Sequence, residues 1–193
     1  MLNYVEYGKE NKYDDDIFFQ KYSQMSRSQQ GLAGAGEWET LRKLLPDFKD
    51  KRVLDLGCGY GWHCIYAMEH GASSVVGVDI SHKMLEVAKE KTHFPQVEYK
   101  CCAIEDVEFP EESFDVILSS LAFHYVADYE ILVKKIYRIL KSGGKLVFTV
   151  EHPVFTAYGT QDWHYNEKGE ILHFPVDNYY YEGKRTAVFL GEK

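Results

Sequence analysis

Three glycines at alternate positions follow a short apolar run, and this loop constrains the fold more than any other feature of the sequence. The segment reads VLDLGCGYG over residues 53–61, with Gly57, Gly59 and Gly61 directly after the apolar run. Glycines at the end of a buried strand let the backbone turn tightly and approach a bound ligand closely. The pattern therefore predicts a strand that ends at a ligand site, with a helix after it.

Apolar runs alternate with helical patterns through the middle of the chain. The runs that we expect to form strands are residues 53–56, 75–78, 97–101, 114–119 and 145–150. Helices are expected after the glycine loop and over residues 81–91 and 128–140, the second beginning at the N-cap Ser81. This alternation is typical of parallel sheets that are covered by helices on both faces. We therefore expect an α/β fold with a mostly parallel sheet in three αβα layers.

Composition narrows the class of protein. The 193 residues are 45% hydrophobic and 27% charged, the balance of a folded domain. The net charge of −8 argues against a wide nucleic-acid surface, and no apolar run reaches the roughly 20 residues that span a bilayer. The N-terminus lacks the pattern of a secretory signal, and the four cysteines have no CxxC spacing. We expect a cytoplasmic protein with neither a nucleic-acid nor a membrane partner.

Two carboxylates accompany the glycine loop. Asp79 closes the second expected strand, 22 residues after Gly57, where a carboxylate can accept hydrogen bonds from both hydroxyls of a ribose. Asp55 precedes the first glycine by two residues, and it can order the loop or meet the ammonium group of a ligand, directly or through water. An NAD-dependent oxidoreductase shares much of this pattern, but Trp62 stands where the dinucleotide fingerprint GxGxxG has its third glycine. An adenosyl nucleoside fits better.

Four segments carry a resemblance to a known family. They are VLDLGCGYG, VVGVDIS, FPEESFDVILSSLAFHYV and ILKSGGKLVFTVEHP. In that order, they resemble the first motif, the acidic second-strand motif and the segments around the fourth and fifth strands of the class I S-adenosylmethionine-dependent methyltransferases with a type-11 methyltransferase domain. The resemblance covers residues 50–152. It implies methyl transfer from S-adenosyl-L-methionine, bound over the first half of a Rossmann-like sheet of seven strands.

The resemblance also implies contacts to the methionine and ribose parts of the cofactor. The three glycines of the loop, together with Cys58, would line the amino-acid part, beside Asp55. Asp79 would hold the ribose hydroxyls. Ser119 would lie beneath the methionine moiety at the end of the fourth strand. Tyr22 and Met25 resemble a lid that closes over the cofactor in some relatives.

The adenine contacts follow from the same resemblance. Ile80 and Met84 would border the adenine, and Ile104 and Glu105 would meet its amino edge. The family often has Asp where this chain has Ala103, which puts a side-chain hydrogen bond to adenine in doubt.

His124 and His152 follow the fourth and fifth strands at the active edge of such a sheet, and they are the candidates for a general base. The sequence shows no His or Cys spacing typical of a metal site, so we expect no metal. The residues after strand four, Ser119-Ser-Leu-Ala, lack the motif of methyltransferases that act on nucleic-acid amino groups. A small-molecule acceptor is the reading that remains. The alternatives are a non-catalytic or truncated methyltransferase-like protein and, less favoured, an NAD-dependent oxidoreductase.

The chain divides into three expected parts: an N-terminal helical lid over 1–48, a cofactor-binding core over 49–152 and an aromatic-rich, substrate-side insertion or tail over 153–193. The tail holds nine aromatic residues in 41, and 186–190 is its best strand. Because five strands are complete by residue 150, we expect the sheet to lack the last two strands of the family. The exposed edge at the fifth strand would be covered by the tail or by a second copy in a homodimer.

Overall fold

A computed structural model describes residues 9, 11–157, 160–183 and 185–191 of the chain. The chain forms two compact units, residues 1–150 and 151–193. Within the described ranges, no helix has both the length and the apolar character needed to cross a membrane.

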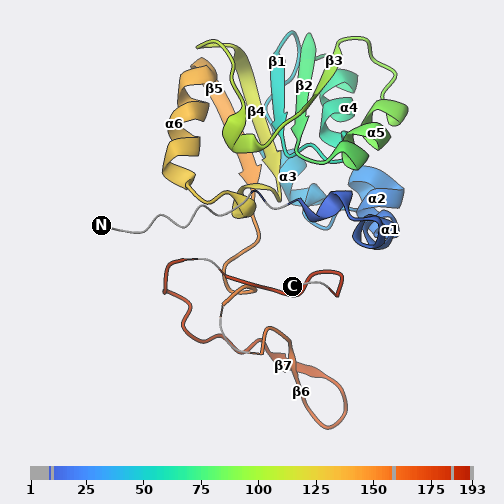
Figure 1. Ribbon diagram of the computed structural model, residues 1–193, viewed down its shortest axis with the longest axis vertical. Helices are drawn as coiled ribbons and strands as arrows, with labels where there is room; N and C mark the ends of the chain where they lie inside the picture. The colour runs from blue at the N-terminus through green and yellow to red at the C-terminus, as the bar shows by residue number, and fades with distance from the viewer. Residues whose placement is uncertain (1–8, 10, 158–159, 184, 192–193) are drawn as a thin grey trace. The chain divides into compact units, whose positions relative to one another are not determined.

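The first unit is built on a five-stranded sheet in which every pairing is parallel (Figure 1). The strands are β1 (Arg52–Leu56), β2 (Ser74–Asp79), β3 (Val97–Cys101), β4 (Phe114–Ser120) and β5 (Leu140–Thr149). Their order is β3-β2-β1-β4-β5, so the direction of winding reverses between β1 and β4. Open α/β sheets bind ligands outside the carboxyl ends of the strands at such a reversal. The predicted α/β fold is confirmed.

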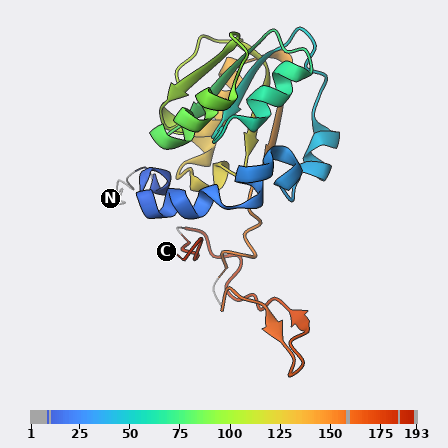
Figure 2. The same ribbon diagram turned by 90° about the vertical axis from the view of Figure 1, so that its right-hand side faces the viewer.

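Helices lie on both faces of this sheet and across its carboxyl edge. They are α1 (Asp16–Ser23), α2 (Ser26–Gln30), α3 (Trp38–Leu44), α4 (Trp62–Glu69), α5 (His82–Lys91) and α6 (Tyr129–Ile139). Short 3-10 turns are η1 (Lys12–Asp14), η2 (Gly31–Gly34), η3 (Ile104–Asp106) and η4 (Phe123–Tyr125). Helices α4 and α5 cover one face and α6 the other, while the N-terminal helices lie where the strands end (Figures 1 and 2).

Alternating residues of the central strands β1, β2 and β4 supply two separate cores. Val53 of β1 is buried with Ala67 of α4 and Leu85 of α5. Its neighbour Leu54 is buried on the opposite face with Ile136 of α6. The apolar sequences of these central strands follow from this, because a parallel sheet between helices buries both faces of its strands.

The junction of α6 and β5 differs from the sequence prediction. The helix ends at Ile139 and the strand begins at once, rather than at residue 145. Pairing with β4 then shifts, from Leu140 opposite Phe114 to Lys145 opposite Val116. The intervening residues form an irregularity in which Gly143 has a φ of 75°. Gly143 therefore lies in a bulge within β5 and does not separate the helix from the strand.

The second unit is mostly irregular, with one short hairpin. Strands β6 (His164–Tyr165) and β7 (Ile171–His173) pair antiparallel across a turn containing Gly169, whose φ is 78°. The predicted strand at 186–190 is wrong, since Phe189 alone in that stretch makes a bridge. A strand needs a paired neighbour, and alternation of apolar residues alone did not reveal which segment has one.

Candidate functional site

The glycine loop joins β1 to α4, and β2 fixes its backbone. The N–H groups of Gly57 and Cys58 both donate to the carbonyl oxygen of Val78, at 2.8 and 2.9 Å. The φ angles of the three glycines are 78°, 52° and 75° for Gly57, Gly59 and Gly61. Residues with a Cβ rarely adopt such angles, so the alternating glycines are a requirement of this loop.

Two of these glycines also meet close neighbours. A Cβ on Gly57 would lie 2.3 Å from the Cβ of Ala122, and one on Gly61 would lie 2.2 Å from the Tyr99 hydroxyl oxygen. At Gly59 the nearest atom, the Met84 methyl carbon, would be 3.4 Å away. Packing within the protein therefore demands glycine at the first and third positions, whereas the middle one has room beside Met84.

Asp79 ends β2 and ties the loop to the start of α5. One oxygen, Oδ2, accepts the N–H of Gly59 at 2.8 Å, and the other, Oδ1, accepts the N–H of Ser81 at 2.9 Å. Its exposed fraction is 9%, and burial raises the pKa of this carboxyl although both hydrogen bonds oppose the shift. A carboxylate has about four acceptor positions. Asp79 therefore keeps capacity to hold the two hydroxyls of a ribose.

Asp55 lies in β1 beneath the loop, almost fully buried. Its Oδ2 accepts a weak hydrogen bond from the Cys64 sulfur at 3.5 Å, and its Oδ1 has no hydrogen-bond partner. Burial raises the pKa of Asp55 to about 7. Buried polar atoms are nearly always satisfied, so the unpartnered oxygen fits a donor from a ligand or a bridging water. The free acceptor positions of Asp79 and Asp55 together fit a nucleoside that carries an ammonium group.

The predicted adenine contacts lie around the same loop. Ile80 is half-buried directly after Asp79, and Met84 is buried in the first turn of α5. Ile104 belongs to η3, and its Cδ1 lies 3.5 Å from the position of a Cβ on Gly57. The carbonyl of the half-buried Glu105 accepts a hydrogen bond from the ammonium group of a lysine in α6.

Tyr22 and Met25 come from the N-terminal helices. The Tyr22 ring packs edge-to-face on Tyr60 of the glycine loop, with 5.9 Å between ring centroids, and on Tyr13 at 5.2 Å. Met25 precedes α2, and its N–H donates to the Tyr22 carbonyl at 3.0 Å. Burial raises the pKa of Tyr22 to about 12. Two of these residues were not predicted from the sequence: Tyr60, which joins Tyr22 to the glycine loop, and Tyr13, which packs on Tyr22.

The ends of β4 and β5 carry a second set of polar groups. The Ser119 hydroxyl is buried and donates to the carbonyl of Leu56 at 2.8 Å. The next residue, Ser120, donates to Glu37 Oε1 at 3.2 Å, and its hydroxyl lies 3.1 Å from that of Thr149. Glu37 also forms an ion pair with Arg27 of α2. No sequence pattern predicted this cluster, because its members are far apart along the chain.

The two candidate histidines belong to different units. His124 lies in η4, with its ring centroid 4.4 Å from that of Tyr125, and partial burial lowers its pKa. The Tyr125 hydroxyl in turn lies 3.3 Å from that of Tyr13 in the N-terminal segment. His152 belongs to the second unit, where its Nδ1 accepts the N–H of Val154 at 3.3 Å. Across the described residues, no group of three or more His, Cys, Asp and Glu is placed to hold a metal.

Comparisons with known proteins show the family to which the chain belongs. A model of the methyltransferase domain matches residues 54–148. A solved structure of a Mesorhizobium loti S-adenosylmethionine-dependent methyltransferase is 41% identical, with a TM-score of 0.71, covering 77% of this chain and 68% of that one. A Listeria monocytogenes protein assigned to the same class is 57% identical, with a TM-score of 0.75 and coverages of 81% and 74%. This chain belongs to the S-adenosylmethionine-dependent methyltransferases. Its cofactor is therefore S-adenosyl-L-methionine.

A third relative is more distant. The ubiquinone biosynthesis O-methyltransferase of Coxiella burnetii is 36% identical over 112 residues. The match covers 57% of this chain and 47% of the relative, so this methyltransferase spans about half the length of that enzyme.

Proposed function

We propose that this methyltransferase moves the methyl group of S-adenosylmethionine to an oxygen or nitrogen of a small-molecule acceptor, without a metal. The observation that carries the proposal is the cluster at the ends of β4 and β5. There the hydroxyls of Ser120 and Thr149 lie together with the Arg27–Glu37 ion pair. Hydroxyls and a single carboxylate suit hydrogen bonding to a small polar acceptor. The name of the Coxiella burnetii relative supports an acceptor of that kind.

For methyl transfer the protein mainly has to position the methyl donor and the acceptor. The cofactor supplies an activated methyl group on a sulfonium. Positioning donor and acceptor in line and excluding water can supply on the order of 7–11 kcal/mol of the barrier. A general base is needed only where the acceptor must lose a proton, and His124 is our candidate in that case because lowered pKa keeps its ring neutral and able to accept a proton.

Cofactor binding is tested first, with Asp79→Asn. Losing the carboxylate removes charge-assisted hydrogen bonds to the ribose, each worth about 1.5–3 kcal/mol. We expect the Kd for S-adenosylmethionine, measured by isothermal titration, to rise at least about tenfold. Glu86→Gln is the matched control, since Glu86 is exposed on α5. A Kd for Asp79→Asn equal to that of the wild type would contradict the ribose role. Thermal shift with NAD and with S-adenosylhomocysteine separates the nucleotide classes.

Transfer is tested by release of S-adenosylhomocysteine against a panel of phenols, hydroxy acids and amines, with and without EDTA. We expect turnover that EDTA leaves unchanged and that His124→Ala reduces for acceptors whose proton must leave. Turnover abolished by EDTA would overturn metal independence. Tight cofactor binding without turnover on any acceptor of the panel would favour the non-catalytic alternative.

A further inference from the structure

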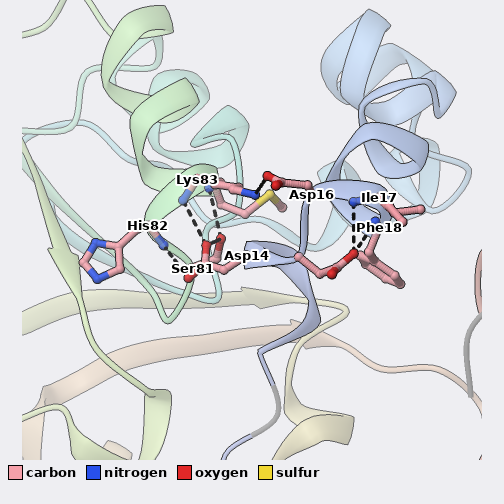
Figure 3. A network of polar contacts seen from close by, with 9 residues as sticks. Asp14, Asp16, Ile17, Phe18, Ser81, His82 and Lys83 are labelled. Carbon is pink, nitrogen blue, oxygen red and sulfur yellow. Dashed lines mark hydrogen bonds and ion pairs between the residues drawn. The ribbon is translucent and has the colours of Figure 1, made fainter.

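The segment before α1 reaches across to the first turn of α5, 67 to 69 residues further along the chain (Figure 3). The Oδ1 atom of Asp14 accepts the Ser81 hydroxyl at 2.6 Å and the N–H of Lys83 at 3.1 Å. Its Oδ2 accepts the N–H of His82 at 3.3 Å and the side-chain amide of Asn11 at 2.8 Å. One carboxylate thus collects four donors, three of them from the start of α5.

These contacts make Asp14 a second cap for that helix. The helix has its own N-cap, because the Ser81 hydroxyl oxygen accepts the N–H of Met84 at 3.1 Å. The N–H groups of His82 and Lys83 lie in the first turn, where no carbonyl of the same helix is available. A carboxylate at this end also complements the helix dipole. The hydrogen bonds outweigh the opposing effect of burial and lower the pKa of Asp14 to about 2, so the cap stays charged at neutral pH.

The turn that Asp14 caps is the turn that carries the ribose carboxylate. Ser81 donates its N–H to Asp79, and the side-chain amide of Asn11 donates to the carbonyl of Ile80 at 3.4 Å. At its other end, the N-terminal segment, residues 11–23, rests on the glycine loop through Tyr22 and Tyr60. The N-terminal segment therefore touches both halves of the cofactor site.

We propose that Asp14 is the latch of a lid: it holds the N-terminal segment on α5 and thereby sets the rate at which S-adenosylmethionine and its product leave. Asp14 acts through the segment that it anchors and is a positioning residue. The inference goes beyond methyl transfer to a particular acceptor, and it depends only on cofactor binding beside Asp79.

Three consecutive aspartates supply matched controls. Asp15 is the N-cap of α1, accepting the N–H groups of Ile17 and Phe18 at 3.0 and 2.9 Å, so it acts within the N-terminal segment. Asp16 forms an exposed ion pair with Lys83. Figure 3 shows the Asp14 carboxylate at the backbone N–H groups of His82 and Lys83, while the Asp16 carboxylate meets the side chain of Lys83. Exposed ion pairs contribute little, so Asp16→Asn should be nearly silent.

The test measures the dissociation rate of S-adenosylmethionine by displacement with excess S-adenosylhomocysteine. For Asp14→Ala we expect a rate about tenfold higher than that of the wild type, the effect of losing one cap. Asp14→Asn, which keeps the shape but loses the charge, should show a smaller rise, and Asp16→Asn should stay within about twofold. Rates for Asp14→Ala within twofold of the wild type, or equal rises for Asp14→Ala and Asp16→Asn, would overturn the latch.

Hydrogen exchange without any ligand gives a second readout. Asp14→Ala should speed amide exchange in residues 11–23 and leave β1 and β2 unchanged. Unchanged exchange in residues 11–23 would refute the latch even if the cofactor rates moved. If exchange in Asp14→Ala is also faster in β1 and β2, and Asp14→Asn does not restore protection there, the variant has lost stability in general and the latch is refuted. If the wild type does not bind S-adenosylmethionine, the cofactor assignment is wrong, which is a different outcome from failure of the latch.

Discussion

Asp55 and Asp14 show how the surroundings of a single carboxylate decide its chemistry. Asp14 receives four hydrogen bonds, which lower its pKa to about 2. Asp55 receives one weak hydrogen bond from Cys64 and is almost fully buried, so its pKa rises to about 7. Burial disfavours a charged carboxylate unless hydrogen bonds replace the lost water. Asp14 therefore stays charged and can anchor the N-terminal segment, whereas Asp55 changes its charge near neutral pH.

Stability should therefore depend on pH through Asp55. The carboxyl titrates near 3.8 in the unfolded chain and near 7 in the folded protein, so between these values the folded state holds an extra proton. Its contribution to the free energy of unfolding is fully present below about pH 4 and is lost as the pH rises through 7. Asp55→Asn abolishes this titration. From pH 5 to pH 8 we expect the variant to gain on the order of 2 kcal/mol relative to the wild type, measured by urea unfolding without ligand.

The control for this experiment is Glu69→Gln, at an exposed position of α4. It should follow the wild type at both pH values. A difference between Asp55→Asn and the wild type that does not change with pH would show that Asp55 is ionised throughout, or protonated throughout, over this range.

Sequence reasoning identified local roles of single residues and missed distant ones. Asp79 at the end of β2 and the N-cap Ser81 follow from strand ends and helix starts, which are readable over a few residues. The contacts of Asp14 with α5 could not be predicted from neighbouring residues. Its partners lie 67 to 69 residues away, and no periodicity announces a contact of that separation.

At the scale of elements, the alternation of apolar runs and helical patterns predicted the sheet because its central strands, β1, β2 and β4, are buried on both faces. It placed the start of β5 too late, since Gly143 and Gly144 signal a break that the structure uses as a bulge. It missed β6 and β7, whose five residues are all exposed. A hydrophobic pattern arises where side chains are buried, so the sequence of an exposed hairpin lacks the pattern that would predict its strands.

Two glycines with the same φ allow the cost of backbone strain to be told apart from the cost of overpacking. Gly61 and Gly143 both have a φ of 75°, but a Cβ on Gly61 would meet the Tyr99 hydroxyl at 2.2 Å while one on Gly143 meets nothing within 4 Å. We expect Gly143→Ala to lower the free energy of unfolding by about 1–2 kcal/mol, the cost of the left-handed backbone. Gly61→Ala should cost about 1–3 kcal/mol more because of overpacking.

Urea unfolding at constant m-value checks this pair. The Tyr99→Phe background should recover part of the cost at Gly61 and none at Gly143, because it removes the hydroxyl that a new Cβ would meet. Equal costs for the two alanine variants would show that the loop relaxes freely around Tyr99.

At the scale of the whole molecule, the candidate cofactor-binding residues and the aromatic-rich tail belong to separate units. Both buried cores of the first unit are complete by Val147, and Ser119 is the last candidate cofactor-binding residue along the chain. The second unit has its own internal ties, such as the Arg185 guanidinium donating to the carbonyls of Pro153 and Tyr181 at 2.9 and 2.8 Å. Strand β5 lies at one edge of the sheet, and a homodimer that covers this edge stays a prediction, measurable by sedimentation.

This division predicts that cofactor binding survives without the tail. A chain that stops after Val150 keeps the sheet, both cores, the glycine loop and the N-terminal segment. We expect its Kd for S-adenosylmethionine to stay within about threefold of the full-length value, and His152→Ala in the full chain to leave the Kd unchanged. Turnover on any acceptor found should fall in the shortened chain if the tail supplies part of the acceptor site. A shortened chain whose circular dichroism shows native helix and strand content but which binds no cofactor would place a missing cofactor contact in the second unit.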